Sequence, residues 1–283
     1  MLNINQIQKK MKHIKLFLIA VLSIVSTTAF AQKSEIILLA HRGGCGEGME
    51  NVESTFKKSL AAGIRAFEID VRITKDGKIV LQHDNTLKRT AGIDKHVEDM
   101  TEKELREVTL KDGSKLLFFD ELLKLLKDYP GLFLEIEMKS SKYSDEFLYS
   151  SGYSDKVAKM ALKAKPAEST YVFTSFDTRP LRYIKEHYPE SETGLITGNG
   201  VNHETIAIAL AIGAKRMAAH INKTSRADMD RAHRKGLLVN LWPGKSDDSL
   251  LRAWALGADI HCTDYPSHML DYAKKNYPWL TIK

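Results

Sequence analysis

Residues 66–83 read AFEIDVRITKDGKIVLQH and combine the pattern of two strands with several charged residues. Two apolar, β-branched runs flank Asp76 and Gly77, a dipeptide typical of a tight hairpin turn. A two-residue loop at Asp76 and Gly77 would place Asp70 directly opposite His83. Opposed residues share a face of the sheet, and Glu68 precedes Asp70 by two residues on the same strand. We therefore expect Glu68, Asp70 and His83 to converge on one side.

Outward from this hairpin, short apolar runs alternate with amphipathic stretches. Strands are expected at 36–40, 66–73, 132–138, 171–175, 194–197, 216–219, 237–241 and 259–263. Helices are expected at 52–62, 120–127, 155–163, 178–187, 204–212, 225–235, 247–256 and 266–275. The alternation indicates an α/β protein with a parallel sheet, and the number of repeats favours a closed TIM (β/α)8 barrel. A doubly wound open sheet would give the same alternation.

Composition supports one globular domain. The chain has 283 residues, 43% hydrophobic and 28% charged, which excludes disordered, collagen-like and disulfide-dense classes. No low-complexity linker divides residues 32–283, so we expect a single domain. Within it, residues 87–119 form a small insertion over the barrel mouth, where Thr101 and Glu104 are spaced as a helix capping box.

The first residues have the pattern of an export signal. Four lysines precede an apolar run at 16–25, and Ala29 and Ala31 then provide a small-residue cleavage site. We expect residues 1–31 to be a signal peptide and the protein to be periplasmic or secreted, with no stable membrane span after cleavage. The apolar run is too short to span a bilayer, although an uncleaved anchor is the alternative.

Charge and cysteine content restrict the partners. The formal net charge is +6, but removing the four leader lysines leaves 38 basic against 36 acidic residues, or +2. A nucleic-acid partner therefore loses its main support. Cys45 and Cys262 permit one disulfide without providing a disulfide framework. The sequence does not indicate an oligomeric state.

Two expected strands carry carboxylates at alternate positions. Glu135, Glu137 and Lys139 point one way, as Glu68 and Asp70 do on the other strand. A solvated edge strand alternates in the same manner, but two such strands ending at one edge favour a carboxylate metal site. Oxygen ligands select a hard divalent cation, Ca²⁺ or Mg²⁺, over zinc.

Imidazole and guanidinium groups are expected at the same edge. His41 and Arg42 directly follow the first strand, and ligands of parallel α/β proteins bind at the carboxyl ends of strands. Two histidines with a metal and cations suit phosphodiester cleavage, because one imidazole takes a proton from the attacking oxygen and the other donates one to the leaving alcohol. Such hydrolysis requires no organic cofactor.

A family resemblance spans nearly the whole chain after residue 32. Its motifs are Ala40-His41-Arg42-Gly43, Glu50-Asn51, Phe67-Glu68-Ile69-Asp70-Val71, Thr74-Lys75-Asp76-Gly77, His83-Asp84, Glu137-Met138-Lys139, Thr174-Ser175-Phe176-Asp177, Trp242 and Thr263-Asp264-Tyr265-Pro266. Together and in this order, they resemble the glycerophosphodiester phosphodiesterase family.

The resemblance implies a TIM barrel of the phospholipase C-like phosphodiesterase type that hydrolyses glycerophosphodiesters to sn-glycerol 3-phosphate and an alcohol. The residues that it implies are His41 and His83 as the acid/base pair, Glu68, Asp70 and Glu137 as metal ligands, Arg42 and Lys139 as phosphate-binding cations, Trp242 as a substrate contact, and Glu50 as an acid near the site. Ca²⁺ is the ion most expected, with Mg²⁺ as the alternative.

Two departures from the family pattern leave the substrate open. The segment Trp242-Pro243-Gly244-Lys245 differs from the usual sequence beside this tryptophan. Glu135 is a further metal or substrate contact, or else a carboxylate paired with Lys139. Alternative substrates are lysophospholipids, sphingolipids and glycerophosphoinositol, and the alternative without catalysis is a phosphodiester-binding barrel.

Overall fold

Eight parallel strands close into a ring in the computed structural model, which describes residues 34–283. Their order is β1–β11–β10–β9–β8–β7–β6–β2, and Ala40 of β1 pairs with Phe67 of β2 to complete the circle. The strands are β1 (Glu35–Ala40), β2 (Ala66–Ile73), β6 (Phe133–Met138), β7 (Thr170–Ser175), β8 (Glu192–Thr197), β9 (Arg216–His220), β10 (Leu238–Gly244) and β11 (Ile260–Thr263). The ring confirms the predicted TIM barrel and excludes the open sheet.

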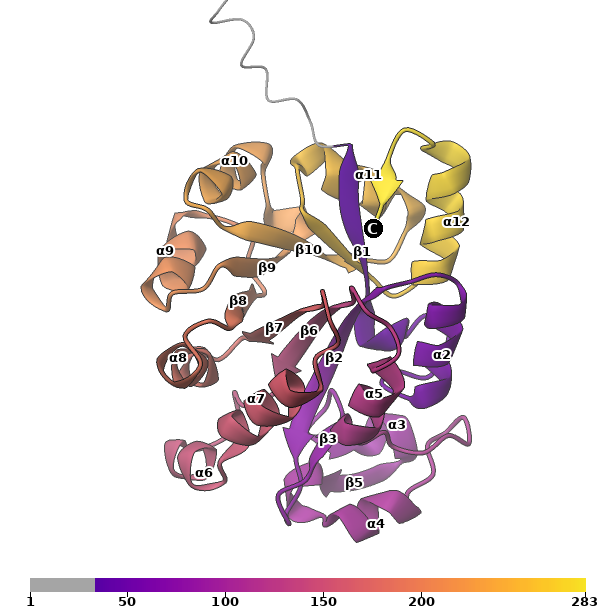
Figure 1. Cartoon of the computed structure of the whole chain (residues 1–283), viewed down its shortest axis with the longest axis vertical. Coiled ribbons are helices and arrows are strands. Elements are labelled where there is room, and N and C mark those ends of the chain that lie inside the picture. Colours follow the sequence, from indigo (N-terminus) through magenta and orange to yellow (C-terminus); the bar gives the residue numbers. More distant parts are fainter. Residues whose placement is uncertain (1–33) are drawn as a thin grey trace, which may run out of the picture. The chain divides into compact units, whose positions relative to one another are not determined.

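Helices surround the strands (Figure 1). They are α2 (Glu53–Ala61), α5 (Phe119–Leu126), α6 (Asp145–Ser150), α7 (Tyr153–Ala164), α8 (Thr178–His187), α9 (His203–Ala211), α10 (Arg226–Arg234), α11 (Asp247–Leu256) and α12 (Pro266–Asn276). In α8, Asp177 caps the first turn by accepting from the Arg179 N–H, and Leu181 and Ile184 are fully buried. Apolar residues three or four apart share one helix face, so each helix closes the core between itself and the sheet.

The hairpin after β2 has a longer loop than predicted. Strand β3 (Ile79–Leu81) pairs with β2 so that Ile73 faces Ile79, and the Thr74 N–H donates to the Lys78 carbonyl at 2.8 Å. Gly77 adopts φ +79°, which is the left-handed conformation used in three-residue loops. The extra loop residue shifts the register by one, so Gln82 stands across from Asp70 and the predicted pairing with His83 is wrong.

Residues 86–107 form a small group of elements beside β3 (Figure 1). These are β4 (Thr86–Leu87), α3 (Lys88–Ala91), β5 (Ile93–His96), η2 (Val97–Asp99) and α4 (Glu102–Glu107). They share an apolar cluster with β3 that includes Val80, Leu87 and Phe118. The predicted capping box of α4 is present, because the Glu104 N–H donates to Thr101 Oγ1 and the Thr101 N–H donates to Glu104 Oε2. Short elements η1 (His41–Gly43), η3 (Ile221–Lys223) and β12 (Thr281–Ile282) complete the described fold.

The barrel interior changes from apolar to charged along its axis. Leu39, Phe133, Val172 and Ile260 form an apolar cluster inside the ring. Glu68, Asp70, Glu135 and Glu137, also buried, lie farther toward the carboxyl ends of β2 and β6. The helix-covered outer layer and the apolar cluster therefore support a polar mouth.

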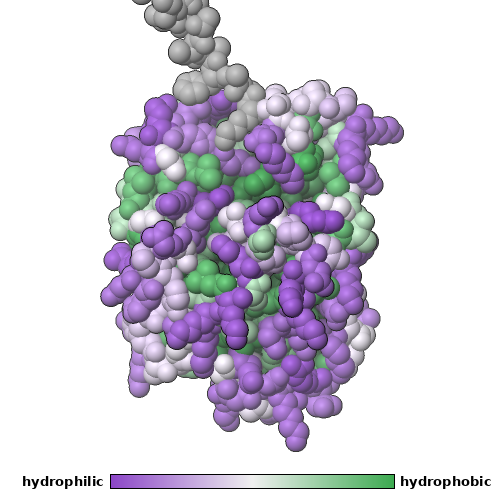
Figure 2. Space-filling model, viewed as in Figure 1, coloured by the Kyte–Doolittle hydropathy of each residue, from purple (hydrophilic) through white to green (hydrophobic). Residues whose placement is uncertain are grey.

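The outer face drawn in Figure 2 is mainly hydrophilic, with hydrophobic residues visible between the polar ones. Among residues 34–283, no helix is long and apolar enough to cross a membrane. Cys45 and Cys262 are both free thiols. The predicted signal peptide at 1–31 lies outside the described residues.

His261 on β11 gives the fold a pH-dependent stability. Its Nδ1–H donates to the Leu241 carbonyl at 3.0 Å, and Nε2 lies 2.9 Å from Ser249 Oγ on α11. Complete burial lowers the His261 pKa from 6.5 to about 4. Between pH 4 and pH 6.5, this histidine is protonated in the unfolded chain but neutral in the folded chain. The contribution of His261 to the free energy of unfolding is therefore complete above pH 6.5 and is lost as the pH falls towards 4.

We predict that His261→Gln reduces the loss of stability at acidic pH. The free energy of unfolding of the wild type should fall more steeply between pH 7 and pH 4.5, with a difference on the order of 3 kcal/mol. Urea unfolding at each pH measures it, and His268→Gln, at an exposed histidine, is the control. Equal pH slopes for wild type and His261→Gln would contradict the assignment.

Candidate active site

Four buried carboxylates lie side by side on two neighbouring strands. The register of β2 and β6 sets Glu68 beside Glu135 and Asp70 beside Glu137. Because alternate residues of a strand share a face, both pairs point into the barrel. Ligand oxygens of Glu68, Asp70 and Glu137 lie within 4.8 Å of one another. The strand pairing thus creates a concentrated negative charge at the mouth.

Asp70 is the centre of this cluster and has the most cationic surroundings. Arg42 Nε lies 3.3 Å from its Oδ2, Lys139 Nζ lies 3.3 Å from its Oδ1, and Asn51 Nδ2 donates to Oδ2 at 2.9 Å. Burial alone would raise the Asp70 pKa, but Lys139, His83 and Arg42 outweigh it and hold the pKa below its ordinary value. Asp70 is therefore a carboxylate at neutral pH.

Glu68 and Glu137 are less well compensated. Burial, together with the charges of the neighbouring carboxylates, raises the pKa of both side chains. Glu68 Oε1 is buried and has no hydrogen-bond partner within residues 34–283. A hard divalent cation would relieve this repulsion and occupy that oxygen, so the donor set fits a Ca²⁺ or Mg²⁺ ion.

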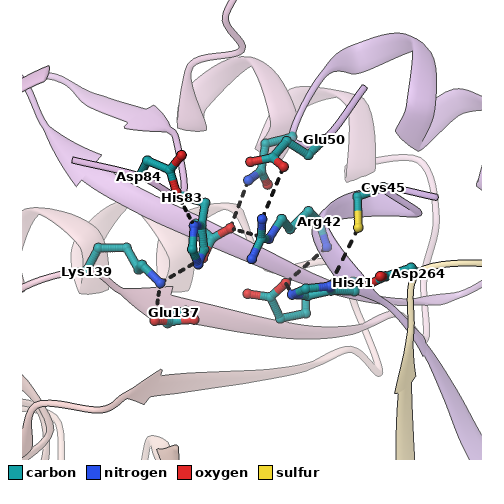
Figure 3. Close-up of polar contacts among 12 residues, drawn as sticks. His41, Arg42, Cys45, Glu50, His83, Asp84, Glu137, Lys139 and Asp264 are labelled. Atoms are coloured by element: carbon teal, nitrogen blue, oxygen red, sulfur yellow. Dashed lines mark hydrogen bonds and ion pairs between the residues drawn. The ribbon is translucent and has the colours of Figure 1, made fainter. Parts of the chain in front are cut away.

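His41 lies on one side of the cluster, on η1 directly after β1 (Figure 3). Its Nδ1 lies 2.6 Å from Asp264 Oδ1, and its Nε2 lies 3.9 Å from Glu68 Oε2. Cys45 Sγ is 3.6 Å from the same Nδ1. The Asp264 contact orients the ring, leaving Nε2 turned towards the carboxylates.

The backbone at η1 is tightly constrained. Arg42 has φ +51°, an unusual value for a residue with a side chain, and Gly43 has φ +84°. A Cβ at Gly43 would approach the Phe56 ring to 3.1 Å. In this conformation the Arg42 N–H donates to Glu68 Oε2 at 3.0 Å while its side chain reaches Asp70. The turn therefore delivers a backbone donor and a guanidinium to neighbouring carboxylates.

His83 lies on the other side of the cluster, just past β3 (Figure 3). Its Nδ1 is 2.7 Å from Asp84 Oδ1, and Arg72 donates to its backbone carbonyl at 2.9 Å. Burial lowers the His83 pKa, although Asp70 opposes this effect. The position of the ring follows from the chain beyond the hairpin rather than from the predicted register.

Glu50 does not touch the carboxylate cluster directly. It accepts from Arg42 Nη1 at 3.1 Å and makes two hydrogen bonds with Arg89, at 2.6 and 2.7 Å. Arg89 also donates to Asp84 at 2.7 Å. This chain of ion pairs links the η1 turn to the 86–107 elements and to the partner of His83.

Glu135 does not pair with Lys139, one of the two alternatives that the sequence allows. Lys139 Nζ lies 2.6 Å from Glu137 and 3.3 Å from Asp70, whereas Glu135 Oε2 accepts from Asn240 Nδ2 at 2.9 Å. Burial raises the Glu135 pKa to about 7, with the Asn240 hydrogen bond opposing the shift. The alternative in which Glu135 pairs with Lys139 is therefore wrong, and the side chain contacts a neutral amide instead.

Three of the buried carboxylates and both histidines line a cavity, which we call the site cavity. Its walls include both histidines, Glu68, Glu135 and Glu137, together with Phe176, Trp242, Pro243, Lys245 and Asn240. Trp242 packs edge-on against Phe176 and His220. Strand β10 continues through Gly244, with a register shift after Leu241, so the unusual segment 242–245 forms part of the wall.

Most of the predicted site residues come together here, along with several partners that the sequence did not indicate. No motif assigned a role to Asp264, Asn51, Arg89 or Asn240, although each contacts a predicted site residue: His41, Asp70, Glu50 and Glu135, respectively. Asp264 and Asn51 stand within the quoted motifs, and Asp264 follows a strand end, which is a signal for a site residue. Arg89 has no such signal because its position depends on how the 86–107 elements fold.

Fold and site together define a TIM-barrel hydrolase with an acidic, cation-lined mouth. The sequence profile of the glycerophosphoryl diester phosphodiesterase family matches residues 41–268. The chain belongs to this family, and it is an enzyme that hydrolyses phosphodiester bonds. The binding-barrel alternative is therefore set aside.

Individual relatives agree with this assignment. A glycerophosphodiester phosphodiesterase from Caldanaerobacter subterraneus subsp. tengcongensis is 26% identical, covering 84% of this chain and 98% of the relative. Human lysophospholipase D GDPD1 is 24% identical, covering 83% and 85%. A phosphodiesterase from Oleispira antarctica, solved in complex with the product sn-glycerol-3-phosphate, has the same fold with a TM-score of 0.75, 20% identity, and coverage of 84% and 96%.

We predict that Glu135→Gln stabilises the metal-free protein at neutral pH. The folded state keeps a proton on Glu135 that the unfolded state releases between pH 4.5 and about 7. The contribution of Glu135 to the free energy of unfolding is therefore complete below pH 4.5 and is lost as the pH rises to 7. Glutamine stays neutral, and its amide can also donate to Asn240 Oδ1, which is buried without a partner within residues 34–283.

Relative to wild type, the variant should gain on the order of 3 kcal/mol between pH 4.5 and pH 8. Chemical unfolding in chelator gives the free energies, and Glu204→Gln, at an exposed position of α9, is the matched control. A pH-independent difference would show that Glu135 does not titrate in this range.

Proposed function

We propose that this protein is a metal-dependent glycerophosphodiesterase that releases sn-glycerol 3-phosphate and an alcohol, with His41 and His83 as the acid/base pair. The observation that carries the proposal is the placement of two imidazoles, each oriented by an aspartate, on opposite sides of one cation-lined carboxylate cluster. In-line displacement at phosphorus needs proton transfer on opposite sides. The product-bound Oleispira antarctica neighbour supports the same class of product.

Arg42 and Lys139 position the phosphate. Both cations contact Asp70, and their remaining donors can bind the phosphoryl oxygens. Bound by Glu68, Asp70 and Glu137, a hard divalent ion, Ca²⁺ in first place and Mg²⁺ in second, would supply further charge stabilisation of the phosphoryl group.

The two histidines divide the proton transfers. Asp264 keeps the proton of His41 on Nδ1, so Nε2 is free to take a proton from the attacking oxygen, whether of the neighbouring glycerol hydroxyl or of water. Asp84 orients His83 in the same way, and protonated His83 gives its Nε2 proton to the leaving alcohol. Asp264 and Asp84 are positioning residues here, because each acts through its histidine.

Glycerol has a suitable binding surface in the site cavity. Asn240 Oδ1 and Trp242 Nε1 are buried without partners within the described chain and both residues line this cavity. One acceptor and one donor beside an aromatic ring suit the hydroxyls and carbon face of glycerol. Trp242 is therefore assigned to glycerol binding.

A lysophospholipid is the second candidate substrate. Phe176 is 44% exposed at the cavity wall and, with Trp242 and Pro243, gives an apolar surface for an acyl chain. The similarity to human lysophospholipase D GDPD1 favours this alternative. Comparing glycerophosphocholine with lysophosphatidylcholine separates the two, since the first proposal requires the soluble diester to be hydrolysed faster.

Export to the periplasm or medium is proposed for the same protein. The basic, apolar and small-residue segments of residues 1–31 support it. Sequencing the amino terminus of the protein recovered from the cell exterior would test cleavage before Gln32.

We predict that hydrolysis requires both metal and His41. Protein beginning at Gln32 should release glycerol 3-phosphate from glycerophosphocholine or glycerophosphoethanolamine in Ca²⁺ or Mg²⁺, and chelator should abolish the release. His41→Ala and His83→Ala should each lower kcat by roughly 100-fold or more, because general acid–base catalysis contributes that much. His187→Ala on α8 is the control. Full activity in chelator or in His41→Ala would refute the mechanism.

We also predict that the divalent ion stabilises the fold through the carboxylate cluster. An ion at 100 times its Kd should raise the free energy of unfolding by about 2.7 kcal/mol, which thermal unfolding detects as a higher Tm. Glu137→Gln should lose most of the shift, while Glu146→Gln, at an exposed position of α6, should keep it. An unchanged shift in Glu137→Gln would place the ion elsewhere.

A further inference from the structure

A second cavity adjoins the site cavity on the far side of His83. The two cavities share His83, Glu137 and Phe176, whereas His41 lines only the first. Figure 3 shows the same division, with His83, Asp84 and Lys139 on one side and His41 and Asp264 on the other. A phosphate bound at the carboxylate cluster therefore has access to two separate spaces.

The second cavity is strongly cationic. Its lining contributes five positive side chains, Arg72, Lys88, Arg89, Lys139 and Lys142, against two carboxylates, Asp84 and Glu137. The site cavity is acidic instead, since four carboxyl groups, those of Glu68, Glu135, Glu137 and Asp264, line it against two cations, Arg42 and Lys245. The two spaces that meet at His83 thus differ in the sign of their charge.

Not all of these cations are available to a ligand. Glu98 pairs with Arg72, and Glu50 and Asp84 pair with Arg89. Lys88 pairs with Asp94, but its side chain is 69% exposed, so this ion pair is weak and exchangeable. Lys142 is exposed and makes no hydrogen bond or ion pair within residues 34–283. Lys142 and Lys88 are therefore the cations that an incoming anion can recruit.

The direction of the reaction assigns an occupant to this cavity. The argument rests on the proposed function, in which His41 takes the proton of the attacking oxygen and His83 protonates the leaving one. The new P–O bond then forms on the His41 side, and the P–O bond to the alcohol breaks on the His83 side. The leaving alcohol, which gains the His83 proton, must extend past His83 into the second cavity.

We propose that the second cavity is the leaving-alcohol subsite and that it selects alcohols carrying an additional phosphate group. Lys142 and Lys88 are the specificity-determining residues. Their ammonium groups offset the negative charge of the second phosphate, which takes no part in the displacement at the first. A cationic alcohol such as choline is repelled by the positive charges of this cavity and therefore binds there more weakly. The preferred substrate is thus a glycerophosphodiester with a second phosphate on its alcohol.

A matched pair of substrates tests this selection. Glycerophosphoinositol and glycerophosphoinositol 4-phosphate differ only in one phosphate on the alcohol, and glycerophosphocholine adds the cationic case. With wild-type protein in the same divalent ion, kcat/KM for the phosphorylated diester should exceed the other two by about 10-fold at low ionic strength. The advantage should shrink as salt is added, because exposed charges are screened.

Charge reversal locates the effect. Lys142→Glu should lower kcat/KM for glycerophosphoinositol 4-phosphate by about 10-fold, equivalent to 1.4 kcal/mol, and should raise that for glycerophosphocholine. Lys88→Glu should act in the same directions. Lys235→Glu, at the exposed carboxyl end of α10 and in neither cavity, is the control and should leave the ratio unchanged.

Binding of the free alcohol gives a readout that does not need turnover. Titration calorimetry of wild-type protein with inositol 4-phosphate should show binding that weakens in Lys142→Glu and persists in Lys235→Glu. If no diester is hydrolysed but this pattern holds, the proposed function fails while the anion subsite stands. If the phosphorylated diester has no advantage, or Lys142→Glu affects all diesters equally, the subsite proposal is overturned although the phosphodiesterase stands.

Discussion

The structure depends on holding several negative charges inside a protein. Glu68, Asp70 and Glu137 are buried within a few ångströms of one another, and carboxylates in such surroundings resist ionisation unless cations compensate them. Asp70 is compensated by the protein itself, through Arg42 and Lys139, whereas Glu68 and Glu137 are left with raised pKa values. This imbalance makes the cluster receptive to an external cation and also to an anionic substrate held by the same Arg and Lys.

The barrel provides the rigidity that such a cluster requires. Parallel pairing of β2 with β6 fixes the carboxylates in register, and the apolar layer beneath them excludes water from one side. The groups that must approach substrate come instead from the segments that follow the strands: η1 carries His41 and Arg42, the end of the hairpin carries His83, and the end of β11 carries Asp264. Scaffold and chemistry are thus separated along the barrel axis, as is usual for this fold.

Loops and short elements outside the strands surround that core. The 86–107 elements send Arg89 to Glu50 and Asp84, so their folding is coupled to both sides of the site. Their Lys88 and the Lys142 that follows β6 give the second cavity its positive charge, while the 242–245 segment shapes the wall of the first. The residues to which we assign substrate preference therefore lie in loops, where side chains can change without disturbing the buried carboxylates.

The sequence alone predicts the barrel, its strands and helices to within a few residues, and the gathering of Glu68, Asp70, Glu137 and His41 at one mouth. Periodicity carries this information because alternate strand residues share a face and parallel strands end at one edge. The hydrogen-bond partners of the site residues are visible only in the tertiary structure. Asp264 contacts His41, Arg89 contacts Glu50, and Asn240 rather than Lys139 contacts Glu135. It also corrected the hairpin, because Gly77 in the left-handed conformation adds one loop residue and shifts the register. Contacts between residues far apart in the chain depend on side-chain packing at ångström precision, and no local pattern in the sequence encodes it.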